Sequence, residues 1–121
     1  IGEVLKRQNP SIKIWAVEPE NAAILSGGSV GTHLQMGIGD GLIPENLNTT
    51  IYEHICVISD AQAIETAKRL ASEEGIMCGI SSGSNVAAAI KLARRLGKGK
   101  TVVTVLPDTG ERYFSTVLFD D

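Results

Sequence analysis

The sequence lacks the features that mark membrane, nucleic-acid-binding and disulfide-rich proteins. No apolar run approaches the ~20 residues that a membrane helix requires. The 11 basic and 14 acidic residues give a net charge of −3, spread along the chain, which argues against nucleic acid or an anionic membrane as partner. Cys56 and Cys78 form no CxxC pair and have no histidine at ligand spacing. We therefore expect two buried thiols in a reducing compartment and no metal site.

The motifs of common nucleotide-binding and hydrolytic enzymes are missing or incomplete. No Gly-Lys-Ser/Thr of a P-loop occurs. Gly79–Gly83 matches G-x-S-x-G, the nucleophile elbow of serine hydrolases, in the expected context before a helix. Both histidines, His33 and His54, precede this serine, whereas the hydrolase order places the histidine after it. A serine-hydrolase triad in that order is therefore not favoured.

The spacing of apolar residues predicts one α/β domain with a largely parallel sheet, because strand-like and helical segments alternate. The predicted strands are residues 12–17, 54–58 and 101–106, and the last is the clearest because it is continuous and β-branched. The predicted helices are residues 1–9, a helix that begins at the Ser59/Gln62 capping box and ends at Gly75, and a helix that ends at Gly97. Residues 19–50 show neither period, and a loop of that length is usually functional or disordered.

Three polar, glycine-rich segments interrupt this scaffold and hold the candidate functional residues. They are Gly37–Pro44, Gly79–Gly83 and Pro107–Arg112. The second opens a helix and the third follows a predicted strand, and ligands of open α/β sheets bind at such carboxyl ends. Each segment has two possible interpretations, one structural and one functional. The glycines form a flexible turn or admit a flat ligand, the serines cap the helix or bind a ligand atom, and the last segment is a turn or faces a ligand.

Taken together, these segments resemble the C-terminal half of cysteine synthase (O-acetylserine sulfhydrylase), a fold-type II pyridoxal-phosphate enzyme. The resemblance runs in order from Ile14–Pro19 through the three glycine-rich segments to Thr116. It implies an α/β fold, the parallel-sheet three-layer sandwich of the tryptophan synthase β type, with residues 1–121 as the C-terminal part. The family's Schiff-base lysine and phosphate loop belong to an upstream portion, so no catalytic residue is assigned in this chain.

The resemblance also implies which residues surround the cofactor, pyridoxal 5'-phosphate. Ser81 corresponds to the serine that hydrogen-bonds the pyridine nitrogen, and Pro107 and Asp108 match the segment near that end of the ring. A hydroxyl, unlike a carboxylate, does not favour a protonated ring. The residues that match the substrate cleft are Gly37, Ile38 and Gly39.

The implied reaction of the whole enzyme replaces the acetate of O-acetyl-L-serine by sulfide and forms L-cysteine. The resemblance further implies a cytoplasmic homodimer and, as in some members, association with serine acetyltransferase. Asp40 departs from the family pattern, because related enzymes often carry a small residue there, and we expect substrate access to differ.

Three alternatives remain open from the sequence. A cystathionine β-synthase shares the glycine-rich and Ser-Gly segments but uses L-serine and homocysteine, although Gly110–Tyr113 favours cysteine synthase. O-phosphoserine as donor calls for an extra cation, and residues 31–44 contain no lysine or arginine. The third alternative is a non-catalytic α/β binding or regulatory module.

Overall fold

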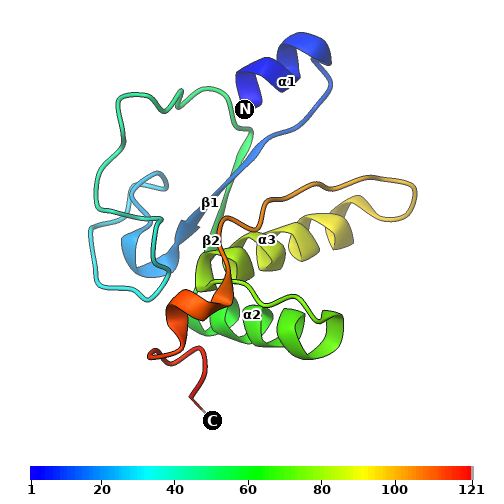
Figure 1. Cartoon of the computed structure of the whole chain (residues 1–121). Coiled ribbons are helices and arrows are strands. Elements are labelled where there is room, and N and C mark those ends of the chain that lie inside the picture. The colour runs from blue at the N-terminus through cyan, green and yellow to red at the C-terminus, as the bar shows by residue number, and fades with distance from the viewer. Residues whose placement is uncertain (121) are drawn as a thin grey trace.

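Two parallel strands form the sheet of this chain, of which the computed structural model describes residues 1–120 (Figure 1). Strand β1 (Trp15–Pro19) pairs with β2 (His54–Ile58), so that Pro19 lies opposite Ile58 at the carboxyl ends. Parallel strands require a crossover connection. Residues 20–53 supply it here and contain no regular structure beyond the short 3₁₀ helix Glu20–Ala22. The predicted parallel α/β architecture and the long irregular segment are both confirmed.

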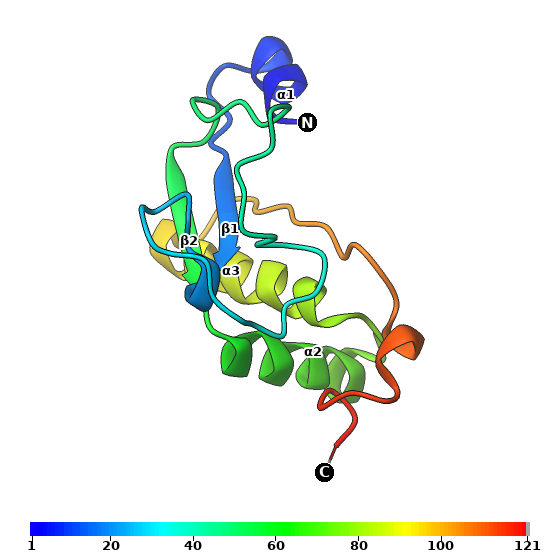
Figure 2. The same cartoon turned by 90° about the vertical axis from the view of Figure 1, so that its left-hand side faces the viewer.

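Helices α2 (Asp60–Glu74) and α3 (Ile80–Leu96) pack against each other, and α3 also contacts both strands (Figure 2). The capping box at the start of α2 is present: the Ser59 hydroxyl accepts from the Gln62 N–H and the Gln62 side chain accepts from the Ser59 N–H. Gly75 ends α2 in the left-handed conformation, with φ 68°, as predicted. The buried hydrophobic core joins these elements and consists of Cys56, Ile58, Ala63, Ala67, Cys78, Ile80, Ala88, Tyr113 and Leu118.

The two helices approach each other most closely at Gly83. A Cβ atom at this position would lie 2.0 Å from the carbonyl oxygen of Ala63 and 2.9 Å from the amide nitrogen of Ala67. Both neighbours are backbone atoms and cannot turn aside. The distance between α2 and α3, and hence the position of the first turn of α3, depends on the absence of a side chain at this one residue.

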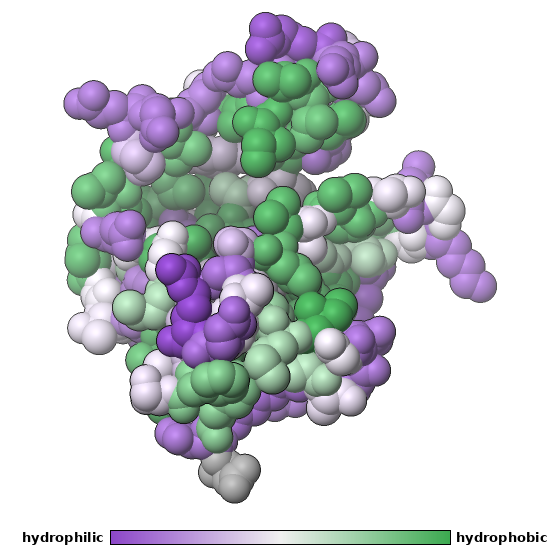
Figure 3. Space-filling view, in the orientation of Figure 1, coloured by the Kyte–Doolittle hydropathy of each residue, from purple (hydrophilic) through white to green (hydrophobic). Residues whose placement is uncertain are grey.

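The predicted strand at residues 101–106 is wrong. This segment pairs with no strand among residues 1–120, and Val103 is 86% exposed. It runs back along α3, where the Asn85 amide donates to the Val105 carbonyl oxygen at 2.8 Å (Figure 1). Apolar, β-branched residues favour a strand, but a strand forms only where the backbone of a neighbouring strand offers hydrogen bonds. The apolar side chains of the segment therefore stay on the surface, among the hydrophobic groups drawn in Figure 3.

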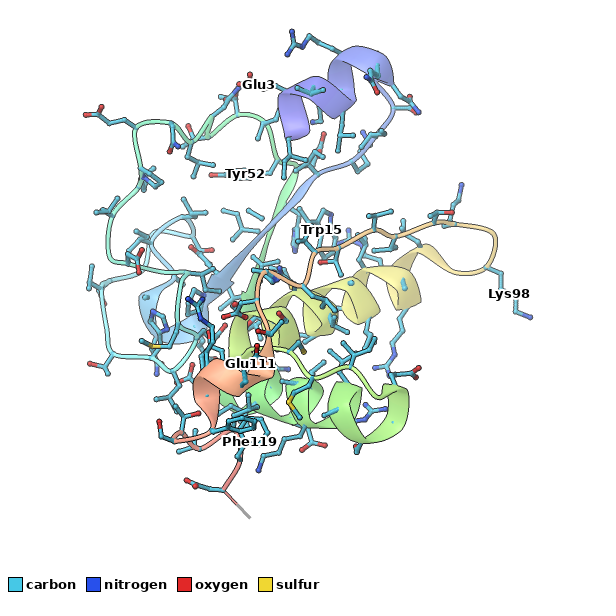
Figure 4. The ribbon with its side chains drawn as sticks, viewed as in Figure 1. Glu3, Trp15, Tyr52, Lys98, Glu111 and Phe119 are labelled. Atoms are coloured by element: carbon cyan, nitrogen blue, oxygen red, sulfur yellow. The ribbon has the colours of Figure 1, made fainter. Side chains whose placement is uncertain are left out.

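The remaining expectations agree with the structure, with small shifts of boundary. The first helix, α1, spans Gly2–Gln8, whereas the first strand begins at Trp15 rather than at residue 12. Trp15 is partly buried against the core and lies beside α3 (Figure 4). The centroid of its ring is 4.2 Å from that of His54, and the Arg95 guanidinium lies over the Trp15 ring. These contacts make Trp15 a structural residue.

The prediction that both cysteines are buried free thiols is confirmed. Cys56 and Cys78 are buried and free, and burial raises the pKa of both thiols. No cluster of metal-ligating side chains occurs among residues 1–120. None of the helices described is long and apolar enough to span a bilayer.

Replacing Gly83 by alanine should destabilise the protein, although alanine normally favours a helix over glycine. Inserting a methyl group against fixed backbone forces the helices apart, which costs about 1–3 kcal/mol or more. Urea denaturation measures the change. Gly2→Ala is the control, because its Cβ would meet the side chain of Ile51, which can turn. Equal stability of Gly83→Ala and the unmodified protein would show that the helix contact does not set the spacing.

Candidate functional site

The long loop between the strands crosses the carboxyl ends of both, where Gln35 anchors it. The Gln35 side chain is 0% exposed. Its amide nitrogen donates to the Ile58 carbonyl oxygen and to Asp60 Oδ1, both at 2.9 Å, and its oxygen accepts from the Ser84 hydroxyl at 2.7 Å. The loop is thereby tied to the end of β2, the start of α2 and the first turns of α3.

The segment that follows Gln35 carries the predicted cleft residues. His33 Nδ1 accepts from the Gln35 N–H at 3.1 Å, so the neutral ring carries its proton on Nε2 and donates it to the Gly39 carbonyl oxygen at 3.0 Å. Gly39 has φ 64°, and a Cβ there would lie 2.6 Å from Pro19 Cγ. Gly37 has φ 89° and open space around its Cα, while Ile38 is partly buried. The loop thus lies over the end of β1 with bare backbone toward open space at Gly37.

The first turn of α3 places two serines in the interior. Ser81 is 4% exposed and Ser82 is 0% exposed. Neither caps the helix, because the N-cap is Gly79 and no side chain bonds the first turn. Neither hydroxyl forms a hydrogen bond of normal geometry within residues 1–120, and Ser82 Oγ is fully buried in that state. Capping therefore does not explain these serines.

Pro107 and Asp108 lie beside this turn. The Gly79 N–H donates to the Asp108 carbonyl oxygen at 3.4 Å, and Cys78 forms an isolated antiparallel bridge with Thr109. A Cβ at Gly79 would lie 2.1 Å from Asp108 Oδ1, so only glycine permits the approach. Pro107 is exposed at the edge of the same site.

The Asp108 carboxylate has a partner that the sequence did not indicate. Asp108 Oδ2 accepts from the Tyr113 hydroxyl. Asp108 Oδ1 is buried with no hydrogen-bond partner in the described chain. Burial, followed by the hydrogen bond to Asp108, raises the pKa of Tyr113 to about 12.

The structure therefore brings the sequence-predicted residues to one end of the sheet. Asp108 contacts Gly79 at the start of α3, two residues before Ser81, and the loop that carries Gly37 and Gly39 is joined to the same helix through Gln35. Sequence reasoning missed Gln35, Ser84 and Tyr113. Nothing in a polar loop marks one glutamine as buried, and the serine pattern at the helix start pointed to Ser81 and Ser82 instead.

Comparison with known proteins identifies the family. The model of the pyridoxal-phosphate-dependent enzyme family matches residues 1–108. The chain belongs to this family. It is 54% identical over 123 aligned residues to a cysteine synthase of Staphylococcus aureus, covering all of this chain and 40% of that protein. The chain thus spans about two fifths of the length of the curated relatives it matches.

Solved structures of related enzymes share the fold. A cysteine synthase of Entamoeba histolytica superposes with a TM-score of 0.94 at 41% identity, over 98% of this chain and 35% of that one. An O-acetylserine-dependent cystathionine β-synthase of Helicobacter pylori superposes with a TM-score of 0.91 at 36% identity, over 98% of this chain and 38% of that one. The fold class is that of the fold-type II pyridoxal-phosphate enzymes, as the resemblance implied.

The residues at the start of α3 fit the family's cofactor. Buried polar atoms without partners are rare in folded proteins and call for water or a ligand nearby. Asp108 Oδ1 is such an atom, whereas the buried Ser82 hydroxyl lies beside the Cys78 thiol. The Ser81 hydroxyl, free of protein partners in the described chain, is able to donate to or accept from a ring nitrogen. The open backbone at Gly37 leaves room for a flat group.

Tyr113 should lose its proton only in strongly alkaline solution. The pKa of the folded state, about 12, lies above the ordinary value of 10.0, so the neutral phenol is favoured by folding. Its contribution to stability is complete below pH 10 and is lost as the pH rises toward 12. In an alkaline pH titration followed by absorbance, one tyrosinate component should form only at high pH. Tyr113→Phe should remove this component, and Tyr52→Phe should retain it. A late component that survives in Tyr113→Phe would contradict the assignment.

Proposed function

We propose that this chain is the C-terminal part of a cysteine synthase, which forms L-cysteine from O-acetyl-L-serine and sulfide with release of acetate. The observation that carries the proposal is identity of 54% to a curated cysteine synthase along the entire chain. The unpartnered hydroxyl of Ser81, at the position that the family motif gives to the cofactor-binding serine, supports it independently.

In this proposal each segment of the site has one task. The Ser81 hydroxyl faces the pyridine nitrogen of the cofactor, and Pro107 and Asp108 border the same end of the ring. Gly37, Ile38 and Gly39 form the wall of the substrate cleft, where backbone without side chains permits close approach. When bound, pyridoxal phosphate supplies the electron withdrawal that allows acetate to leave and sulfide to add. The lysine that holds the cofactor covalently lies in an upstream domain of the complete enzyme.

The charges of the loop at residues 31–44 favour a donor with an uncharged ester over one with a phosphate ester. Asp40 is exposed in that loop, between two glycines with positive φ, and residues 31–44 contain no lysine or arginine. A phosphorylated serine would meet a carboxylate and no compensating cation, which disfavours its binding. We therefore propose O-acetyl-L-serine rather than O-phosphoserine as the donor.

The assembly and location proposed for the complete enzyme follow the family. They are a homodimer in the cytoplasm, with serine acetyltransferase as a further partner. The large exposed side chains of Val103 and Val105, on a segment that the described chain leaves unpaired, suit a sheet that other parts of the enzyme complete.

The absorbance spectrum of the full-length protein tests the proposal. The cofactor band should change when O-acetyl-L-serine is added without sulfide, and L-cysteine should form when sulfide follows. A band that responds to L-serine, or product that forms only with homocysteine, would move the assignment to a cystathionine β-synthase, the activity named for the related Helicobacter pylori enzyme. If no cofactor band forms after pyridoxal phosphate is added, the proposal fails and the remaining interpretation is a non-catalytic α/β binding or regulatory module.

Replacing Ser81 by alanine should weaken cofactor binding and slow the reaction. The variant leaves the ring nitrogen without its hydrogen-bond partner, and losing a partner in a buried site costs about 1–3 kcal/mol. Cofactor fluorescence titration gives the affinity and initial rates give kcat. Ser72→Ala is the matched control, because Ser72 is an exposed helical serine that donates only to backbone in α2. Unchanged affinity and kcat in Ser81→Ala would remove Ser81 from the site.

A further inference from the structure

The Gln35 side chain uses both of its donors and its oxygen for contacts between distant parts of the chain. Both donors of its amide are engaged, one by the Ile58 carbonyl oxygen and one by Asp60 Oδ1, and its oxygen accepts from Ser84. The side chain is fully buried. Ser84 lies 49 residues further along the sequence, so the contact joins the loop to a helix that local structure would not bring near. A buried amide whose two donors and oxygen are all hydrogen-bonded favours one arrangement, because a displacement leaves polar atoms without partners.

The contacts continue from Gln35 into the cleft loop. The Leu34 N–H donates to Asp60 Oδ2 at 2.9 Å, so the Asp60 carboxylate holds two successive residues of the loop. The Gln35 N–H donates to His33 Nδ1, and His33 Nε2 donates to the Gly39 carbonyl oxygen. Each end of the segment is therefore fixed to Gln35, and the glycines between them cannot shift without breaking one of these bonds.

The same side chain reaches the helix that carries Ser81. Ser84 follows Ser81 by three residues in α3, and residues three apart lie on the same face of a helix. Ser84 is 0% exposed, and its hydroxyl donates to Gln35 at 2.7 Å, with the Ile80 carbonyl oxygen as a second, longer acceptor contact at 3.3 Å. Gln35 thus touches both walls of the candidate site, the cleft loop and the first turns of α3.

We propose that Gln35 is a positioning residue that holds the cleft loop at residues 33–41 in register with the first turns of α3. The inference rests on the proposed function, because it assigns the two walls to one substrate and cofactor site. Gln35 contacts neither reacting group. It acts by fixing the distance between Gly37–Gly39 and Ser81, and small misplacements of binding groups are costly in catalysis.

Three variants of the full-length protein separate the contributions. Gln35→Leu removes the donors and the acceptor at similar size. Gln35→Glu keeps the shape and the acceptor for Ser84 but sets a carboxylate against Asp60 and the Ile58 carbonyl oxygen. Ser84→Ala removes one hydroxyl from α3 and leaves the loop sequence untouched. Ser72→Ala, the helical serine outside this set of contacts, is the control.

Hydrogen exchange of backbone amides is the readout that does not depend on activity. In Ser84→Ala, amides of residues 33–41 should exchange about tenfold faster, the scale expected when a buried hydrogen-bond partner is lost. In Gln35→Leu and Gln35→Glu, amides of residues 80–85 should accelerate as well. Ser72→Ala should change neither segment. Faster exchange confined to the mutated segment in each case would overturn the inference.

Kinetics complete the test and separate it from the proposed function. Gln35→Leu and Gln35→Glu should lower kcat/KM for O-acetyl-L-serine by about 10²-fold, as misplaced binding groups do. Wild-type kcat/KM in Gln35→Leu would overturn the positioning role even if the reaction is confirmed. An unmodified protein without a cofactor band would instead refute the proposed function, whatever the exchange rates. Should the Gln35 variants fail to fold, Ser84→Ala carries both measurements.

Discussion

The near contact between α2 and α3 at Gly83 is the constraint on which the site depends. A side chain at this residue would meet the Ala63 carbonyl oxygen at 2.0 Å, so α3 lies as close to α2 as two backbones allow. Ala63 and Ala67 supply the small residues on the facing side and are buried in the core. Because α3 also packs on both strands, this contact fixes where the first turn of α3 stands relative to the carboxyl ends of the sheet. Ser81 owes its position to that packing.

Polar groups in the interior divide into two kinds. Glu18 and Gln35 are buried and hydrogen-bonded through all of their side-chain oxygen and nitrogen atoms. The Glu18 carboxylate accepts from the Leu25 N–H at 2.8 Å and from the Ser26 N–H at 3.0 Å. These side chains tie the irregular segment to the strand ends. Ser82 and Asp108 instead keep buried oxygen atoms without partners. The Ser82 hydroxyl lies beside the Cys78 thiol, which leaves Asp108 Oδ1 as the clear exception. Natural proteins leave such exceptions mostly at functional sites, so this atom marks a place where a ligand is expected.

The sequence predicted elements whose signals are local and failed where a distant partner decides. Helix α2 was correct at both ends, because the Ser59–Gln62 box and the left-handed Gly75 act on neighbouring residues. Residues 101–106 have strand composition but no backbone partner in the described chain, and composition carries no information about partners. The burial of Gln35 could not be predicted from the sequence for the same reason, because it follows from contacts with residues 23, 25 and 49 positions further along the chain. In the first glycine-rich segment Gly37, Gly39 and Gly41 take positive φ, which is a local requirement, whereas Gly79 and Gly83 are needed for close approach to residues distant in the sequence.

The electrostatics of the site distinguish it from one that holds its cofactor ring protonated. The first turn of α3 contains no acidic residue, and the start of a helix carries a partial positive charge. The nearest carboxylate described there, that of Asp108, accepts a hydrogen bond from Tyr113, whose raised pKa keeps that hydroxyl protonated at neutral pH. In the proposed function, the group that meets the ring nitrogen is thus the neutral hydroxyl of Ser81, at the positive end of α3. Under the proposed function, both features disfavour an added proton on the ring, so a bound cofactor would withdraw electrons moderately. In the proposed cysteine synthase, moderate withdrawal suffices to expel acetate, a good leaving group, and the loop at residues 31–44, without lysine or arginine, fits such an uncharged ester donor.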